Sequence, residues 1–253
     1  MLQQEDSIAA GLEMASMPVF NSSEATKVGE QVKQFKGPFC AGRQVQSSGE
    51  KFLIKGMKTP LFSYQFAGSG WMVGRGKSEE GPFGGILANS MGLGKALETL
   101  ACIAGHPPTE EDLEKGLFRT SIVVPANAVS QWIDETYKHG HKMSVAHYKA
   151  SAKSSTAHIE DSSSWVTSYH EVMMHYPSNE GGNRLMKEKF YRVILDEAHA
   201  IKNLKWHTSA SCIALTAKYR WALGGTPVHN RVPGTQWGGS IDAEISSRGG
   251  SDN

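Results

Sequence analysis

The sequence has few cysteines, no long apolar run and no excess charge of one sign, and each absence argues against a class of protein. Its three cysteines follow no C-x-x-C spacing, which argues against a disulfide framework or a zinc module and favours a reducing compartment. No apolar run approaches the ~20 residues that span a bilayer, and the first residues lack the basic and apolar parts of a signal peptide. Because 26 Lys and Arg nearly balance 25 Asp and Glu, a nucleic-acid partner would have to bind a local basic patch.

Composition and patterning indicate one α/β region between two polar ends. The 253 residues are 39% hydrophobic, enough for one large domain or two small ones. We expect residues 1–58 to form a polar, partly disordered leader, residues 59–230 the folded domain, and residues 231–253 a disordered Gly/Ser-rich tail. Expected strands alternate with expected helices inside the domain, which predicts an α/β fold with a mostly parallel sheet.

Individual elements follow from apolar runs and from helical periodicity. The expected strands cover residues 86–88, 121–125, 143–148, 165–169, 190–195 and 219–223. The expected helices cover residues 59–72, 95–104, 127–139 and 206–217. An exposed acidic insertion is expected over 106–116 and a flexible connector over 149–164, while Trp132 and Trp165 are expected in the core.

The strongest local signal is a glycine-rich loop in residues 84–104, between a short strand and a helix. The glycines let backbone N–H groups approach an anion, the helix N-terminus adds partial positive charge, and Lys95 would bring a full charge to terminal phosphates. The match to G-x-x-x-x-G-K-[ST] is partial, because Asn89 replaces the first Gly and Ala96 replaces the hydroxyl residue that ligates Mg²⁺. The alternative is a glycine-rich turn with an exposed lysine.

Two carboxylates, Asp196 and Glu197, close the apolar run 190–195. In nucleotide hydrolysis Asp196 would hold Mg²⁺, and Glu197 would orient and deprotonate the attacking water. The alternative is a solvated acidic turn. Ligands of parallel sheets bind at the carboxyl ends of the strands, so we expect the glycine loop, this pair and Gly225-Thr226 to converge there.

Taken in chain order, these segments resemble the motifs of the SWI/SNF-type helicase-like ATPases. The segments that resemble motifs I, II (the DEAH box) and III are 89–95, Asp196-Glu197-Ala198-His199 and Gly225-Thr226-Pro227. Those that resemble the Q-like motif and motifs Ia and Ib are 60–71, 123–132 and 166–169. The resemblance covers residues 59–230, and within the family the sequence is most similar to the fungal Rad-type DNA-repair branch.

The resemblance implies a RecA-like P-loop lobe, with helices on both faces of its sheet, from a helicase-like ATPase of the nucleus. Such an ATPase uses ATP and Mg²⁺ to translocate on double-stranded DNA, in chromatin remodelling or DNA repair. The nucleotide-binding residues it implies are Gln65, at the adenine, and Met91, Gly92, Leu93, Gly94, Lys95 and Ala96, with Gly92, Gly94 and Lys95 at the phosphates. The catalytic residues it implies are Asp196, which holds Mg²⁺, and Glu197. The residues it implies for coupling nucleotide state to DNA are His199, Gly225 and Thr226.

The sequence also departs from the family pattern. Asn89-Ser90, Ala96 and Gly224 stand where the family has Asp-Glu, Thr and Thr, and the chain ends soon after motif III. We therefore expect a truncated first lobe with impaired turnover on its own, whose second RecA-like lobe is missing or belongs to a separate chain. The alternatives are a non-catalytic nucleotide- or partner-binding module, a pseudo-ATPase, and a non-functional fragment.

Overall fold

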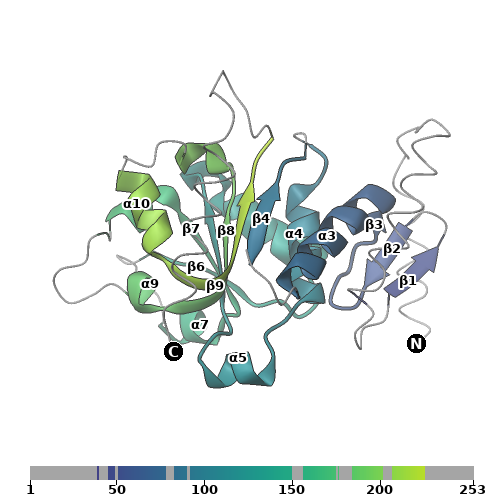
Figure 1. Cartoon of the computed structure of the whole chain (residues 1–253), viewed down its shortest axis with the longest axis horizontal. Coiled ribbons are helices and arrows are strands. Elements are labelled where there is room, and N and C mark those ends of the chain that lie inside the picture. Colours follow the sequence, from purple (N-terminus) through teal and green to yellow (C-terminus); the bar gives the residue numbers. More distant parts are fainter. Residues whose placement is uncertain are drawn as a thin grey trace. The chain divides into compact units, whose positions relative to one another are not determined.

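The chain is described by a computed structural model (Figure 1). The described residues are 39, 45–48, 51–77, 83–89, 92–149, 156–174, 176, 184–201 and 207–225. They divide into two compact units. The first unit comprises residues 1–77, 93–107 and 134–143, and the second comprises residues 78–92, 108–133 and 144–253. The expected tail, residues 231–253, and most of the expected leader lie outside the described residues.

The first unit contains a small antiparallel sheet, two complete helices and residues 134–139 of a third helix. The sheet has the order β1 (Val45–Ser48), β2 (Lys51–Ile54) and β3 (Leu61–Phe62), and the helices are α3 (Ser63–Gly76) and α4 (Lys95–Gly105). Three phenylalanine rings join these elements in the core, because Phe66 of α3 stacks on Phe52 of β2 at 4.5 Å and on Phe39 at 5.1 Å between ring centroids. Strands β1 and β2 fall within the region that we expected to be a polar leader.

Helix α3 begins later than expected. The expected helix would have begun at residue 59. In the structure Leu61 and Phe62 first pair with β2, in the register Phe52↔Leu61 and Lys51↔Phe62. Leu61 is fully buried in this strand. The expectation that a helix begins at Pro60 was therefore wrong, because the apolar residues after Pro60 fit a buried strand as well as a helix.

The second unit contains a six-stranded sheet in which every pairing is parallel. In spatial order, its strands are β4 (Gly84–Leu87), β9 (Thr216–Leu223), β8 (Lys189–Leu195), β5 (Thr120–Val124), β7 (Ser164–Ser168) and β6 (Val145–His147). Each of these strands overlaps one that the sequence predicted. The α/β class with a parallel sheet is confirmed.

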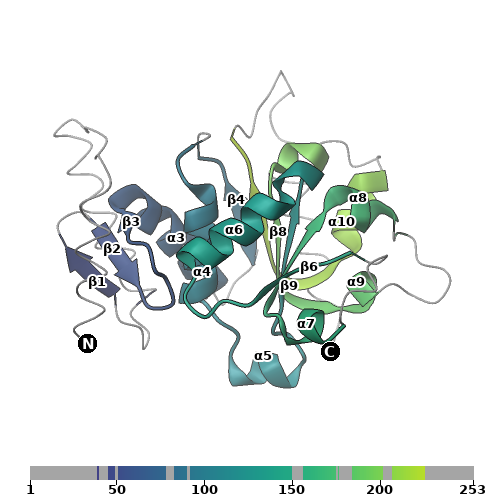
Figure 2. The same cartoon turned by 180° about the vertical axis from the view of Figure 1, so that it is seen from behind.

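Helices connect these strands. They are α5 (Glu110–Glu114), the 3₁₀ turn η1 (Ala126–Ala128), α6 (Val129–His139), α7 (Thr156–Asp161), α8 (Tyr169–Met174), α9 (Arg184–Lys187), η2 (Ala198–Ile201) and α10 (His207–Ala214). Helices α8 and α10 lie side by side in both views (Figures 1 and 2). They share an apolar cluster with the sheet, in which Val172 and Cys212 meet Trp165, Phe190 and Val193. Trp165 thus lies in the core, as the sequence predicted.

Two connections differ from expectation. The connector 149–164 carries helix α7, because Ile159 is buried in the same cluster and its carbonyl accepts the Trp165 indole N–H at 2.9 Å. Helix α10 ends at Ala214 instead of 217, since the chain then enters β9 at Thr216. In the described part of the chain, no helix is both long and apolar enough to cross a membrane.

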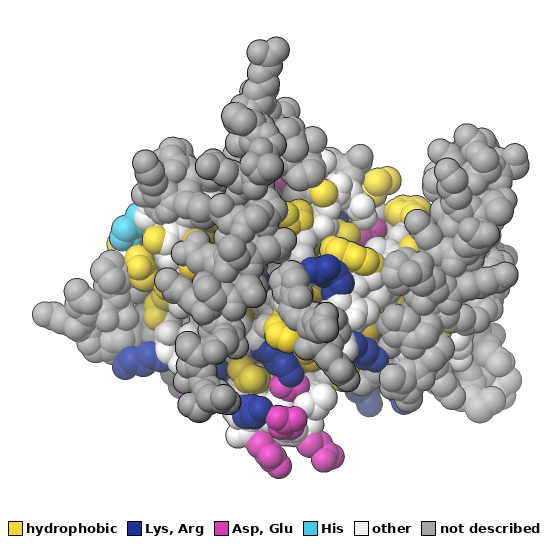
Figure 3. Space-filling model, in the orientation of Figure 1, with side chains coloured by type: hydrophobic (Ala, Val, Ile, Leu, Met, Phe, Trp, Pro, Cys, Tyr) yellow, Lys and Arg dark blue, Asp and Glu magenta, His cyan; other side chains and the backbone are white. Residues whose placement is uncertain are grey.

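The acidic insertion 106–116 is only partly exposed. It contains α5, where acidic side chains gather on the surface (Figure 3). Asp112 is the exception, since it is buried and accepts a 2.6 Å hydrogen bond from Lys218 of β9. Burial by itself raises the pKa of Asp112, but the hydrogen bonds from Lys218 and Thr109 outweigh it and hold that pKa below its usual range. Asp112 therefore ties α5 to the sheet as a charged carboxylate.

Candidate nucleotide site

The glycine loop enters α4 through two left-handed residues. Gly92 has φ 82° and Gly94 has φ 83°, a region that side chains other than glycine rarely adopt. Among the described residues, a Cβ at Gly92 would meet nothing within 4 Å. A Cβ at Gly94 would collide with the Gln65 side-chain amide. The loop is thus closely packed at Gly94.

Lys95 is the first residue of α4. Gly94 is the N-cap and has no side chain with which to cap the helix, while its carbonyl accepts the Glu98 N–H at 3.1 Å. The N-terminal N–H groups of a helix carry partial positive charge and bind anions readily. The loop backbone and a half-buried lysine therefore meet at one helix N-terminus, as a phosphate site requires.

Gln65 fixes the glycine loop to the start of α3. It is buried, and its Nε2 donates to the Leu93 carbonyl at 3.1 Å while its Oε1 accepts the Phe62 N–H at 3.0 Å. Both ends of the amide therefore bind protein backbone. This makes Gln65 a support of the loop, a role that the sequence did not indicate, and its contact with adenine stays a prediction.

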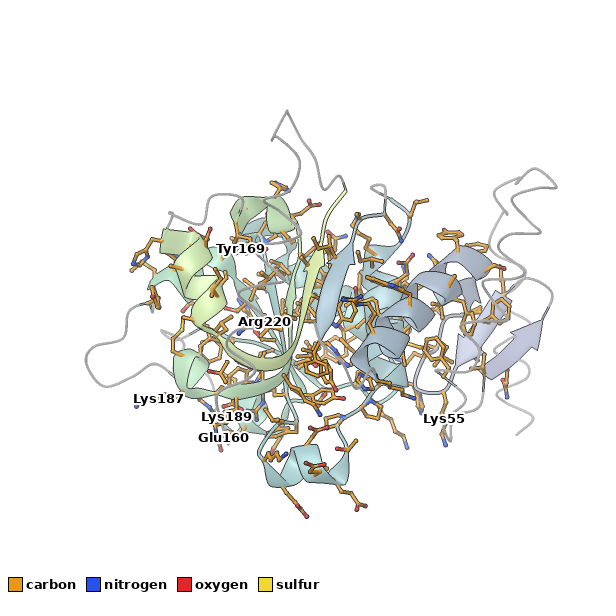
Figure 4. The ribbon with its side chains drawn as sticks, in the orientation of Figure 1. Lys55, Glu160, Tyr169, Lys187, Lys189 and Arg220 are labelled. Carbon is orange, nitrogen blue, oxygen red and sulfur yellow. The ribbon has the colours of Figure 1, made fainter. Side chains whose placement is uncertain are left out.

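The second half of the expected site lies at the carboxyl edge of the parallel sheet. The register pairs Leu195 of β8 with Ala222 of β9, and Leu87 of β4 with Leu223, so the residues that follow these strands share one edge. They are Asn89 after β4, Asp196 and Glu197 after β8, and Gly224 and Gly225 after β9. Figure 4 shows Tyr169, which follows β7, at this end of the sheet and Lys189, which begins β8, at the other.

At least four hydrogen bonds hold Asp196 among the described residues. Its backbone N–H donates to the Val123 carbonyl at 2.9 Å, and its own carbonyl accepts the Tyr169 hydroxyl at 2.8 Å. Its carboxylate accepts the Trp132 indole N–H on Oδ2 at 2.7 Å and the Glu197 N–H on Oδ1 at 2.9 Å. Both carboxylate oxygens are thus oriented by protein donors.

Glu197 has a strained backbone, and one of its buried carboxylate oxygens has no hydrogen bond among the described residues. Its φ of 48° lies in the left-handed region, which costs a non-glycine residue roughly 1–2 kcal/mol. Its Oε2 atom is buried and has no hydrogen bond among the described residues, although His199 Nδ1 lies 3.2 Å away, within ion-pair distance. Buried polar atoms in native structures nearly always have a hydrogen-bond partner, so this oxygen is suited to a partner that arrives with the ligand.

The predicted site residues divide between the two units. Those in the first unit are Gln65, Leu93, Gly94, Lys95 and Ala96, and those in the second are Gly92, Asp196, Glu197, His199 and Gly225. Met91 and Thr226 lie outside the described residues.

Comparison with known proteins decides the family. A family profile described as the SNF2-related domain matches residues 64–235. This chain belongs to the SNF2-related family. The match begins in helix α3 beside Gln65 and includes both the glycine loop and the Asp196-Glu197 pair.

The relatives of this SNF2-related chain are longer proteins. A probable global transactivator of Orgyia pseudotsugata multicapsid polyhedrosis virus is 33% identical over 174 residues, which are 68% of this chain and 33% of that protein. The DNA repair protein rad5 of Emericella nidulans is 33% identical over 185 residues, which are 61% of this chain and 15% of that protein. The chain therefore spans a third or less of the length of these relatives.

A solved structure shares the fold of this SNF2-related chain. The Sulfolobus solfataricus SWI2/SNF2 ATPase core in complex with double-stranded DNA has a TM-score of 0.55 and 28% sequence identity. The similarity covers 70% of this chain and 34% of that one. The RecA-like fold inferred from the resemblance is confirmed.

The donor set of the SNF2-related chain fits Mg²⁺ that arrives with a nucleotide. Among the described residues, no group of three or more His, Cys, Asp or Glu side chains could hold a metal ion. Mg²⁺ at phosphate sites typically binds one or two carboxylates together with substrate phosphates and water, so a single oriented Asp196 suffices. At Ala96 a methyl group stands where a hydroxyl would have contributed another oxygen.

Sequence reasoning missed two residues of this site. Trp132 is buried, as expected of a core residue, but it also binds the Asp196 carboxylate. Tyr169 was not singled out, and it binds the Asp196 carbonyl. The available signal was their position in segments 123–132 and 166–169, which resemble motifs Ia and Ib.

Proposed function

We propose that this SNF2-related chain is an ATP-binding lobe that hydrolyses ATP with Mg²⁺ in response to duplex DNA. The observation that carries the proposal is the loop at α4, where Gly92 and Gly94 are left-handed and Lys95 is the first residue of the helix. A nucleotide triphosphate offers the anionic oxygens that this arrangement binds. Family membership and the fold shared with a SWI2/SNF2 ATPase core support the same activity.

Each residue has a distinct role in this proposal. The loop N–H groups and Lys95 would bind the phosphates, and Gln65 would keep the loop in place through Leu93. Asp196 would hold Mg²⁺, which when bound neutralises charge on the phosphate oxygens. Glu197 would accept the proton of the attacking water at its buried Oε2 and orient that water for in-line attack.

The DNA part of the proposal depends on relatives. The solved ATPase core with the shared fold was in complex with double-stranded DNA, and the Emericella relative is named a DNA repair protein. We propose that His199, Gly225 and Thr226 connect the nucleotide to DNA or chromatin, in the nucleus, with a second RecA-like lobe as a partner. His199 supports this role because it lies beside the Glu197 carboxylate and its side chain is 56% exposed.

A second candidate is a nucleotide-binding module without turnover, and Ala96 favours it. The methyl group at this position supplies no oxygen to Mg²⁺, which demands near-octahedral oxygen coordination. The metal would then be held by Asp196, water and the nucleotide phosphates, without a second protein oxygen. Such a site would bind ATP but would preorganise the phosphates less well for attack.

Steady-state phosphate release distinguishes the two candidates. We expect the chain to release phosphate slowly with Mg²⁺ and ATP, faster with duplex DNA, and not at all after Glu197→Gln. Nucleotide binding without any release would favour the non-catalytic module. A chain that binds no nucleotide would contradict both.

A further inference from the structure

The hydrogen bond between Trp132 and Asp196 joins two segments that are 64 residues apart in sequence. Trp132 is 4% exposed, and its indole N–H lies 2.7 Å from Asp196 Oδ2. Indole is a donor only, and a hydrogen bond to an ionised carboxylate is shorter and stronger than a neutral one. Rotation of the carboxylate away from Trp132 would break this buried hydrogen bond, so the bond restricts the Asp196 side chain.

The main chain of Asp196 is held by the segment that contains Trp132 and by the residue that follows β7. Its N–H binds Val123 of β5, the strand that leads into Trp132, and its carbonyl binds the Tyr169 hydroxyl. Tyr169 is 8% exposed, and its hydroxyl donates to that carbonyl at 2.8 Å. Trp132 therefore orients the Asp196 side chain, while Val123 and Tyr169 fix the Asp196 backbone.

We propose that Trp132 is a positioning residue for Mg²⁺ binding, because its indole N–H sets the orientation in which Asp196 presents its carboxylate to the metal. This inference rests on the proposed function, since it assigns the metal to Asp196. It also makes metal affinity depend on segment 123–132, because a shift of that segment would move the carboxylate. Outer-shell partners of metal ligands typically change metal affinity by about 10–100-fold when they are removed.

The test compares two tryptophan variants of the full chain. Trp132→Phe removes the donor to Asp196 and keeps an aromatic ring. The matched control is Trp165→Phe, because Trp165 is also buried in the second unit and donates its indole N–H at 2.9 Å, but to the Ile159 carbonyl. Fluorescence of a labelled ATP analogue is followed while Mg²⁺ is titrated, and affinity with EDTA is measured separately.

We expect Trp132→Phe to raise the Mg²⁺ concentration for half-maximal binding about tenfold, the lower end of the range for outer-shell partners, and to leave affinity in EDTA unchanged. Trp165→Phe should leave both quantities at the wild-type value. Equal Mg²⁺ curves for the two variants would overturn the proposal, since Trp132 would then act only through packing.

Two further measurements keep the test decisive if Trp132→Phe does not fold or if no nucleotide binds. If Trp132→Phe fails to fold, β-(3-benzothienyl)alanine placed at position 132 keeps the bicyclic shape and lacks only the N–H, and the same Mg²⁺ shift is expected. Mn²⁺ binding to the chain without nucleotide, followed by electron paramagnetic resonance, should weaken in the same variants. If no protein binds ATP, the proposed function fails, while the Mn²⁺ affinities still decide the role of Trp132.

Discussion

Replacing Gln65 by methionine should destabilise the first unit and loosen the glycine loop. Methionine fills a similar volume but makes neither the 3.0 Å bond from the Phe62 N–H nor the 3.1 Å bond to the Leu93 carbonyl. Each lost hydrogen bond costs about 0.5–1.5 kcal/mol net, so the free energy of unfolding should fall by roughly 2 kcal/mol. Gln65 is 5% exposed, which leaves water little room to restore these bonds.

Urea denaturation followed by circular dichroism measures this loss. The control is Gln131→Met, because Gln131 is an exposed residue of α6 and such changes usually alter stability by less than about 0.5 kcal/mol. The reasoning is refuted if Gln65→Met costs no more than the control. The affinities of Gln65→Met and of the control for ATP and GTP complete the assay. If Gln65 only supports the loop, its replacement weakens the binding of both nucleotides alike. If Gln65 makes the predicted contact with adenine, its replacement weakens the binding of ATP alone.

Two further outcomes are expected at other positions. Ala96→Thr restores a hydroxyl next to Lys95, and it should lower the Mg²⁺ concentration for half-maximal nucleotide binding about tenfold, measured by the same fluorescence titration; an unchanged value would mean that Asp196 and water suffice. Burial lowers the pKa of His139 despite the Glu135 carboxylate 2.8 Å from its Nε2, so folding disfavours the protonated imidazole; its Nδ1 lies 2.6 Å from the Thr59 hydroxyl. The free energy of unfolding should therefore fall as the pH drops below about 6.5, the ordinary His value, and urea melts of His139→Asn should lack that slope; an identical slope would contradict it.

How much the sequence could predict depended on whether the signal was local. Strands β5 and β8 were predicted because their runs are apolar and β-branched, and the glycine loop was predicted because its spacing requires only adjacent residues. Helix α7 was missed because its Ser/Ala/Lys-rich segment has no periodicity, and burial of Ile159 supplies the order. Hydrogen-bond partners of side chains were the least predictable feature. A sequence shows that Trp132 has an indole donor, but it does not show which acceptor the fold brings to that donor.

The loop at α4 can be tested most directly through Lys95. Isothermal titration calorimetry with a slowly hydrolysed ATP analogue and Mg²⁺ would compare wild type, Lys95→Ala and the control Lys187→Ala, whose lysine is exposed on α9 (Figure 4). A hydrogen bond to a charged group contributes about 1.5–3 kcal/mol, so Lys95→Ala should weaken binding by about 10–100-fold, with the melting temperature and the control unchanged. Equal affinities in all three proteins would contradict a phosphate-binding loop in this chain.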